Sequence, residues 1–129
     1  MMNNKPLKKR PKNLNLFTIR LPINAVVSIL HRASGMALFL ILPLLLLSLQ
    51  LSLANVNGYA HITATYSHWW FKLLFIALSW AFFHHFFAGI RHLAMDVHWM
   101  TSLQKARLSS RWVFAASLIC VAVFAVWVW

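Results

Sequence analysis

The residues of this chain with the greatest chemical potential are gathered in one apolar stretch, Trp69 to Asp96. Its second half carries five ionisable side chains, namely His84, His85, Arg91, His92 and Asp96. The stretch is long and apolar enough to cross a bilayer. Ionisable groups at membrane depth are costly, and they usually face a bundle interior and serve a function. The sequence therefore predicts a functional site within a membrane helix.

The spacing of these polar residues indicates what the site could hold. His85, Gly89, His92 and Asp96 stand at i, i+4, i+7 and i+11, which places them on one face of a helix. A flat ligand could approach the backbone closely at Gly89, which has no side chain. His85 lies one turn away, and histidine is a common axial ligand of haem iron. The pattern favours a membrane helix that holds a haem through His85.

Only one histidine of the adjacent pair can point at a given ligand, because successive helical residues are about 100° apart. His84 shares its helix face with Ala88 and Arg91, so we expect it to be a packing or hydrogen-bonded residue and a less favoured ligand than His85. Arg91 and His92 lie nearer the membrane surface, where they could bind the carboxylates at a porphyrin edge. Asp96 could balance one of these cations, cap the helix or pair with Arg91.

A second polar cluster opens the first apolar stretch. Ser28, His31, Arg32 and Gly35 follow the spacing i, i+3, i+4 and i+7, again one helix face. Arg32 is about 15 Å from Pro22 at helical rise. A snorkelling side chain could explain the arginine alone, but not the serine and histidine beside it. We therefore predict a polar pocket, at a depth similar to that of the histidine pair.

Composition sets the class of the protein. Of 129 residues, 61% are hydrophobic and only 10% are charged, whereas about a quarter of the residues of a soluble domain are charged. Three stretches reach the roughly 20 apolar residues that one crossing needs, at about 25–53, 69–95 and 112–129. The prediction is an all-α integral membrane protein with three transmembrane helices in residues 22–129, preceded by a basic cytoplasmic arm, 1–21.

The distribution of charge predicts the orientation. Twelve Lys and Arg against one acid give a net charge of +11. Nine of these cations precede the first span or lie in the expected loop between the second and third spans, at Lys5, Lys8, Lys9, Arg10, Lys12, Arg20, Lys105, Arg107 and Arg111. The expected loop between the first and second spans, residues 54–68, has none. Because positive residues mark the cytoplasmic side, we expect a cytoplasmic N-terminus and an external C-terminus. This topology signal accounts for the basic residues, so we expect no nucleic-acid binding. The arm could meet anionic lipids or dock a soluble partner.

Two motifs, SILHRASG and HxxxGIRHLxxD, stand in a three-span chain preceded by RPKNLNLFTIRLPI. In these motifs, their order and the topology, the chain resembles the cytochrome b anchor subunits of succinate dehydrogenase, respiratory complex II. The resemblance implies that His85 is an axial ligand of haem b and that Ser28 and Arg32 line the ubiquinone site. It also implies that His31 lies near the haem propionates.

The resemblance further implies a helix bundle completed by a smaller anchor subunit, which supplies the second haem ligand, and an iron–sulfur subunit on the cytoplasmic side that links to a flavoprotein subunit. This chain would then pass electrons to ubiquinone in the inner leaflet, with no flavin or dicarboxylate chemistry and no catalytic residue of the dehydrogenase reaction. Ser28 would donate a hydrogen bond to a quinone oxygen, and Arg32 would stabilise the charge that develops there.

Three alternatives remain at this point. The chain could be a haem-free structural anchor with a quinone pocket, or it could ligate haem iron by both His31 and His85 without a partner. It could also be a small transporter or channel subunit, although the polar residues do not continue into the outer halves of the first two spans. The short basic arm, with no long Arg- and Ser-rich presequence, favours a bacterial inner membrane over a mitochondrial one.

Overall fold

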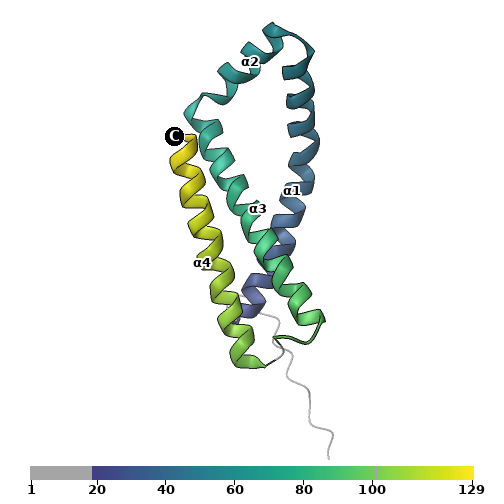
Figure 1. Cartoon of the computed structure of the whole chain (residues 1–129), viewed down its shortest axis with the longest axis vertical. Coiled ribbons are helices and arrows are strands. Elements are labelled where there is room, and N and C mark those ends of the chain that lie inside the picture. The colour runs from purple at the N-terminus through teal and green to yellow at the C-terminus, as the bar shows by residue number, and fades with distance from the viewer. Residues whose placement is uncertain (1–18, 101) are drawn as a thin grey trace, which may run out of the picture.

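A computed structural model describes residues 19–100 and 102–129 of the chain. Four helices account for nearly all of this part: α1 (Ile23–Ala54), α2 (Val56–Tyr66), α3 (Trp69–Asp96) and α4 (Leu103–Val128) (Figure 1). Three of them, α1, α3 and α4, are long and apolar enough to cross a membrane. The predicted all-α class with three membrane helices is therefore confirmed. Most of the predicted N-terminal arm, residues 1–18, lies outside the described residues.

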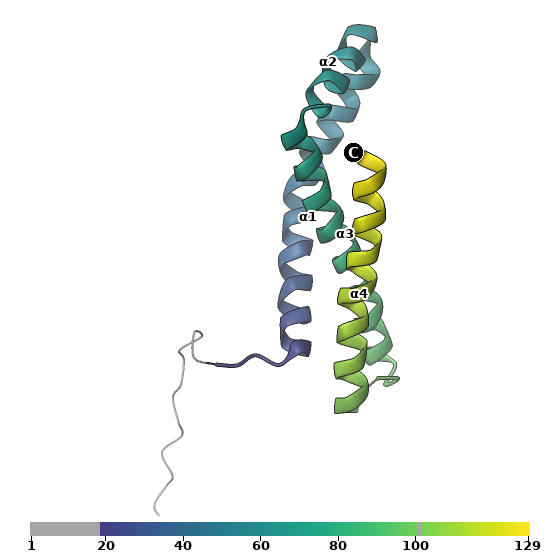
Figure 2. The same ribbon diagram turned by 90° about the vertical axis from the view of Figure 1, so that its left-hand side faces the viewer.

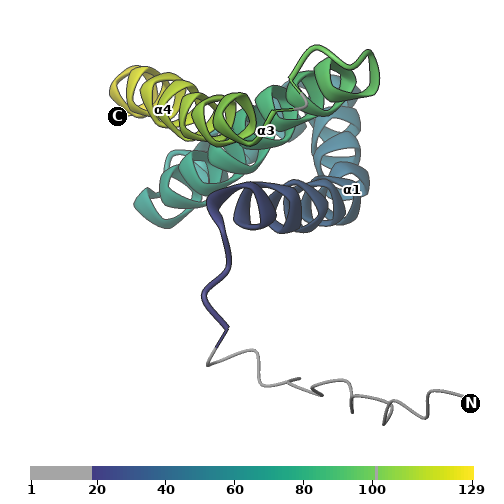
Figure 3. The same ribbon diagram turned by 90° about the horizontal axis from the view of Figure 1, so that it is seen from below.

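Of the three long helices, α1 and α4 run in one direction and α3 runs in the opposite direction (Figure 1). Seen from the lower end of the molecule, α3 lies between α1 and α4 (Figure 3). Helices α1 and α3 approach each other near the start of α1 and diverge toward the opposite end, where α2 connects them (Figure 1). The corner between α1 and α2 extends beyond the end of α4 (Figure 2). The start of α1, the end of α3 and the start of α4 therefore share one end of the molecule.

Local chemistry explains where the long helices begin and end. The carbonyl of Pro22 accepts hydrogen bonds from the first turn of α1, and proline suits this position because it has no N–H to lose. Ser102 caps α4, since its side chain accepts from the backbone N–H of Lys105. Just after α3, His98 adopts a φ of 62°, in the left-handed region that terminates helices.

The segment between the first two spans, which we expected to be a loop, is helix α2. Asn55 caps it, since its side-chain oxygen accepts from the N–H of Gly58 at 2.8 Å. Glycine is required at 58, because a Cβ there would collide with the carbonyl oxygen of Leu51 at the end of α1. The hydroxyl of Tyr66 donates to Ser48 and ties the far end of α2 back to α1. In the sequence, Asn55 and the glycine three residues later were the available signals for the start of this helix.

Helix α4 begins at Leu103, nine residues before the apolar stretch that starts at Trp112. The first turns of α4 therefore contain the basic residues that we had placed in a loop, and their side chains are exposed, namely Lys105, Arg107 and Arg111. Hydropathy marks the part of a helix that can lie in the bilayer, and it does not detect a polar extension of the same helix.

Apart from His84 and Arg91, the residues buried between the helices are small. The buried hydrophobic residues are Val27, Ala81, Ala88 and Val113, and four serines join them, Ser34, Ser79, Ser110 and Ser117. Lipid tails are as apolar as the helix side chains, so the hydrophobic effect does not drive membrane helices together. Small residues let the helix backbones approach closely, and this close packing holds the helices together. Each serine hydroxyl donates to a carbonyl of its own helix, as Ser117 does to Val113 at 2.6 Å. Large apolar side chains, including Phe39, Leu40 and Phe82, remain exposed, as expected for surfaces that face lipid or other membrane subunits.

Enlarging a small residue at the helix junction should separate the helices. Ala88 is completely buried and packs with Val27 and Val113. We expect Ala88→Leu to destabilise the protein by about 1–3 kcal/mol through overpacking. The thermal unfolding temperature of the detergent-solubilised protein measures this effect. Ala77→Leu, at an exposed position of the same helix, is the control, and equal losses of stability in the two variants would contradict the packing.

Candidate functional site

The imidazole of His85 joins α3 to α1. Its Nδ1 lies 3.0 Å from the carbonyl oxygen of His31. A carbonyl oxygen can only accept, so Nδ1 must carry the hydrogen. In the neutral ring, Nε2 then holds the free lone pair, which is the form in which histidine binds a metal. The ring of His85 is only half-buried, so the chain does not enclose it completely.

Two neighbours in α1 fix the position of this ring. Ser34, 3% exposed, donates to the same His31 carbonyl at 2.9 Å, and its Oγ lies 3.5 Å from Nδ1 of His85. Gly35 gives the ring room, because a Cβ at that position would lie 2.7 Å from Cε1 of His85. Ser34 did not enter the predicted site, although it follows His31 by one helical turn, and this spacing was the signal for it.

Three imidazoles form a column between α1 and α3. The rings of His31 and His85 are stacked, with centroids 4.2 Å apart and planes 10° apart. The ring of His92 also lies beside that of His31, with centroids 5.0 Å apart and planes tilted by 48°. His31 also lies against Gly89, where an added Cβ would meet its Nε2 at an ordinary contact distance of 3.6 Å. The structure thus brings together four of the predicted site residues from two helices.

His84 occupies a different environment from its neighbour. It is fully buried at the junction of α1, α3 and α4, with Nε2 3.5 Å from the carbonyl oxygen of Val27. Its ring stacks on Trp80 and contacts Phe114. Its Nδ1 has no hydrogen-bond partner among the described residues. The interpretation of His84 as a packing or hydrogen-bonded residue stays a prediction, to which this structure adds that the ring is fully buried among three helices.

Arg91 is not brought together with the histidine column. It is 5% exposed and extends toward α4, where its Nε donates to Ser109 at 3.0 Å and its Nη2 to the carbonyl of Ala106 at 3.4 Å. Helical periodicity already placed Arg91 on the face of His84 and away from that of His85. The sequence could not show that this face is covered by α4.

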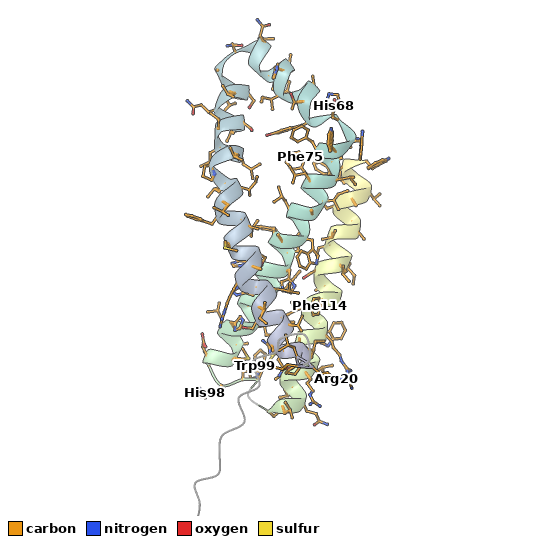
Figure 4. All side chains as sticks on the ribbon, turned by 180° about the vertical axis from the view of Figure 1, so that it is seen from behind. Arg20, His68, Phe75, His98, Trp99 and Phe114 are labelled. Atoms are coloured by element: carbon orange, nitrogen blue, oxygen red, sulfur yellow. The ribbon has the colours of Figure 1, made fainter. Side chains whose placement is uncertain are left out.

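Ser28 and Arg32 lie on consecutive turns of α1, about 8 Å and 14 Å along the axis from Ile23. Ser28 is half-buried and Arg32 is exposed. Asp96 is the exposed last residue of α3. Figure 4 orients the site: Arg20, His98 and Trp99 mark the end of the molecule near which these residues lie, and His68 marks the opposite end.

Comparison with known proteins identifies the family. Residues 6–124 match the family described as the succinate dehydrogenase/fumarate reductase transmembrane subunit. The succinate dehydrogenase cytochrome b556 subunit of Coxiella burnetii is 42% identical over 123 residues, covering 94% of this chain and 98% of that protein. The subunit of the same name from Rickettsia felis is 32% identical, covering 86% of each chain.

Another similar protein is the succinate dehydrogenase cytochrome b560 subunit of Reclinomonas americana, which is 31% identical over 78% of this chain and 73% of its own. The matches extend over all three membrane helices and both clusters of polar residues. The chain belongs to the family of succinate dehydrogenase/fumarate reductase transmembrane subunits.

Proposed function

We propose that this chain is the cytochrome b membrane anchor of a succinate:quinone oxidoreductase and that it holds haem b through Nε2 of His85. The names of its relatives support the cytochrome b role. The hydrogen bond from Nδ1 of His85 to the carbonyl of His31 carries the residue assignment. It leaves Nε2 as the free nitrogen of a half-buried ring and holds the imidazole in one orientation, as ligands are held around metal sites.

The residues present fit a haem at this face. His85 offers one free imidazole nitrogen at this face, and one histidine from a chain is enough for a haem because the porphyrin supplies further nitrogens to the iron. The enclosed ring of His84 makes that residue the weaker candidate. The stacking of His31 on His85 argues against both binding one iron, because axial ligands direct ring nitrogens toward the metal, whereas stacked rings direct their faces toward each other.

His31 of α1 and His92 of α3 are the residues of this face that would bind the haem propionates, and Gly89 lies on the same side of α3 as His92. Arg91, which the sequence also suggested for this role, donates to Ser109 and Ala106 instead. When bound, the haem supplies a one-electron carrier beside the quinone pocket. The chain's contribution is to hold His85 in one orientation and to supply hydrogen-bond donors at the edge of the site.

Quinone reduction is assigned to the α1 face, with ubiquinone as the substrate. Ser28 would donate a hydrogen bond to a quinone oxygen. Arg32, one turn further along, would stabilise the negative charge that develops on that oxygen, an interaction that is strong where water is scarce. The side chain of Arg32 is exposed, which leaves its guanidinium accessible to a ligand.

The remaining surface suggests how the chain is placed in a complex. The exposed cations Arg20, Lys105, Arg107 and Arg111 belong to the end that contains the start of α1 and the start of α4. We assign this end to the cytoplasmic face of a bacterial inner membrane, where the iron–sulfur subunit, itself bound to the flavoprotein subunit, would dock. A smaller anchor subunit would cover the histidine face and supply the second haem ligand.

Replacing His85 tests the haem assignment. In the purified complex, we expect His85→Leu to abolish or strongly alter the b-type absorption spectrum, because the iron loses an axial ligand. His84→Phe is the matched control, since it keeps a flat ring between Trp80 and Phe114, and its spectrum should stay close to that of the unaltered protein. Loss of the spectrum in His84→Phe with an unchanged spectrum in His85→Leu would contradict the assignment.

Replacing Arg32 tests the quinone site. Arg32→Leu should lower succinate:quinone reductase activity by about 10²-fold or more, the loss typical when a group that stabilises developing charge is removed. Reduction of an artificial dye by the soluble subunits should be unaffected, because it does not need this chain. Lys72→Leu removes a cation near the opposite end of the molecule and serves as the control. Equal loss of both activities in Arg32→Leu would contradict the role of Arg32, because the defect would not be specific to the quinone.

A further inference from the structure

Arg91 is a buried cation that the proposed function leaves without a role. Its side chain is 5% exposed, and its two hydrogen-bond partners, the hydroxyl of Ser109 and the carbonyl of Ala106, are both neutral. A guanidinium carries five N–H donors and stays protonated in proteins. Two hydrogen bonds therefore leave part of its donor capacity unused and its charge uncompensated.

The chain itself has little with which to neutralise this charge. Its only acidic side chain is that of Asp96, which is exposed at the end of α3, and the structure shows no contact between it and Arg91. A charge taken out of water is very costly unless it is paired. The position of Arg91 therefore calls for an anion from outside the chain.

An apolar cleft of about 360 Å³ lies beside Arg91 between α3 and α4. Besides Arg91 and Ser109, its lining includes Phe87, Ile90, Trp99, Met100, Trp112 and Ala116. Trp99 and Trp112 are largely exposed, and tryptophan is the residue typical of the membrane–water interface. The cleft thus presents one cation within an otherwise apolar lining, which suits a ligand with an anionic head and a hydrocarbon tail.

Its position matches the depth of lipid headgroups. Arg91 lies five residues before the end of α3, or about 8 Å at helical rise. The exposed cations Lys105, Arg107 and Arg111 on the first turns of α4 lie at the same end, and such clusters attract anionic lipid headgroups. Figure 4 shows Trp99 and Arg20 together at this end.

We propose that the cleft between α3 and α4 binds an anionic phospholipid of the leaflet at this end of the molecule. The phosphate pairs with the guanidinium of Arg91, and an acyl chain extends along the apolar lining past Phe87 and Ala116. This site is separate from the histidine face, because His85 contacts α1 whereas Arg91 contacts α4. An anion at Arg91 therefore fixes the α3–α4 pair and takes no part in the chemistry at α1.

The test uses the intact complex, purified in detergent and stripped of phospholipid. Phosphatidylglycerol and phosphatidylcholine with identical acyl chains are titrated separately, and native mass spectrometry counts the bound lipids while thermal unfolding reports stabilisation. We expect one phosphatidylglycerol to bind preferentially and to raise the unfolding temperature. Arg91→Gln should weaken this binding about tenfold, since one charge-assisted pair is removed. Lys72→Gln, which removes a cation near the opposite end of α3, should bind within about twofold of the unaltered complex.

A second variant covers the case in which Arg91→Gln fails to assemble. Ala116→Leu narrows the cleft while Arg91 and Ser109 remain, so it should also weaken phosphatidylglycerol binding. Unchanged preference for phosphatidylglycerol in either variant would overturn the proposal. Equal stabilisation by inorganic phosphate would overturn it as well, because it would show a site for a free anion and not for a lipid.

Discussion

The contact between His85 and the backbone of α1 is the interaction on which the arrangement of the site depends. Within a bilayer there is no water to satisfy a polar group, so each buried donor must find a partner in protein. The Nδ1–H of His85 finds it in the carbonyl oxygen of His31, which Ser34 also contacts. One carbonyl thus sets the register between α1 and α3, the tautomer of His85 and the direction of its free nitrogen.

Small residues make this contact possible. Gly35 leaves space for the ring of His85 against α1, and Ala88 and Ser34 are buried where the helices meet. Toward the other end the same two helices diverge and are connected by α2 (Figure 1), and the first half of α3 presents larger residues such as Phe71 and Phe75. The polar site therefore lies in the part of the structure where the backbones approach most closely. Close packing here serves both stability and the orientation of the imidazole.

Much of the fold follows from the sequence by elementary rules. Hydropathy locates the three membrane helices, and helical periodicity places His84 and His85 on different helix faces, which have different surroundings in the structure. The same rules do not find α2, because a short polar helix has no hydropathy signal and depends on the cap at Asn55. They also do not show which helix covers each face of α3. The position of Arg91 against α4 is a property of tertiary packing, and no local pattern specifies it.

The measurement that tests the central interaction most directly is the electron paramagnetic resonance spectrum of the haem in Gly35→Ala. The added Cβ would lie 2.7 Å from Cε1 of His85. The ring must therefore move, and the hydrogen bond from its Nδ1 to the His31 carbonyl must lengthen. Ala37→Val, at an exposed position of the same helix, is the control. We predict altered g-values in Gly35→Ala and unaltered ones in Ala37→Val. A Gly35→Ala spectrum identical to that of the unaltered protein would contradict the placement of His85 against α1.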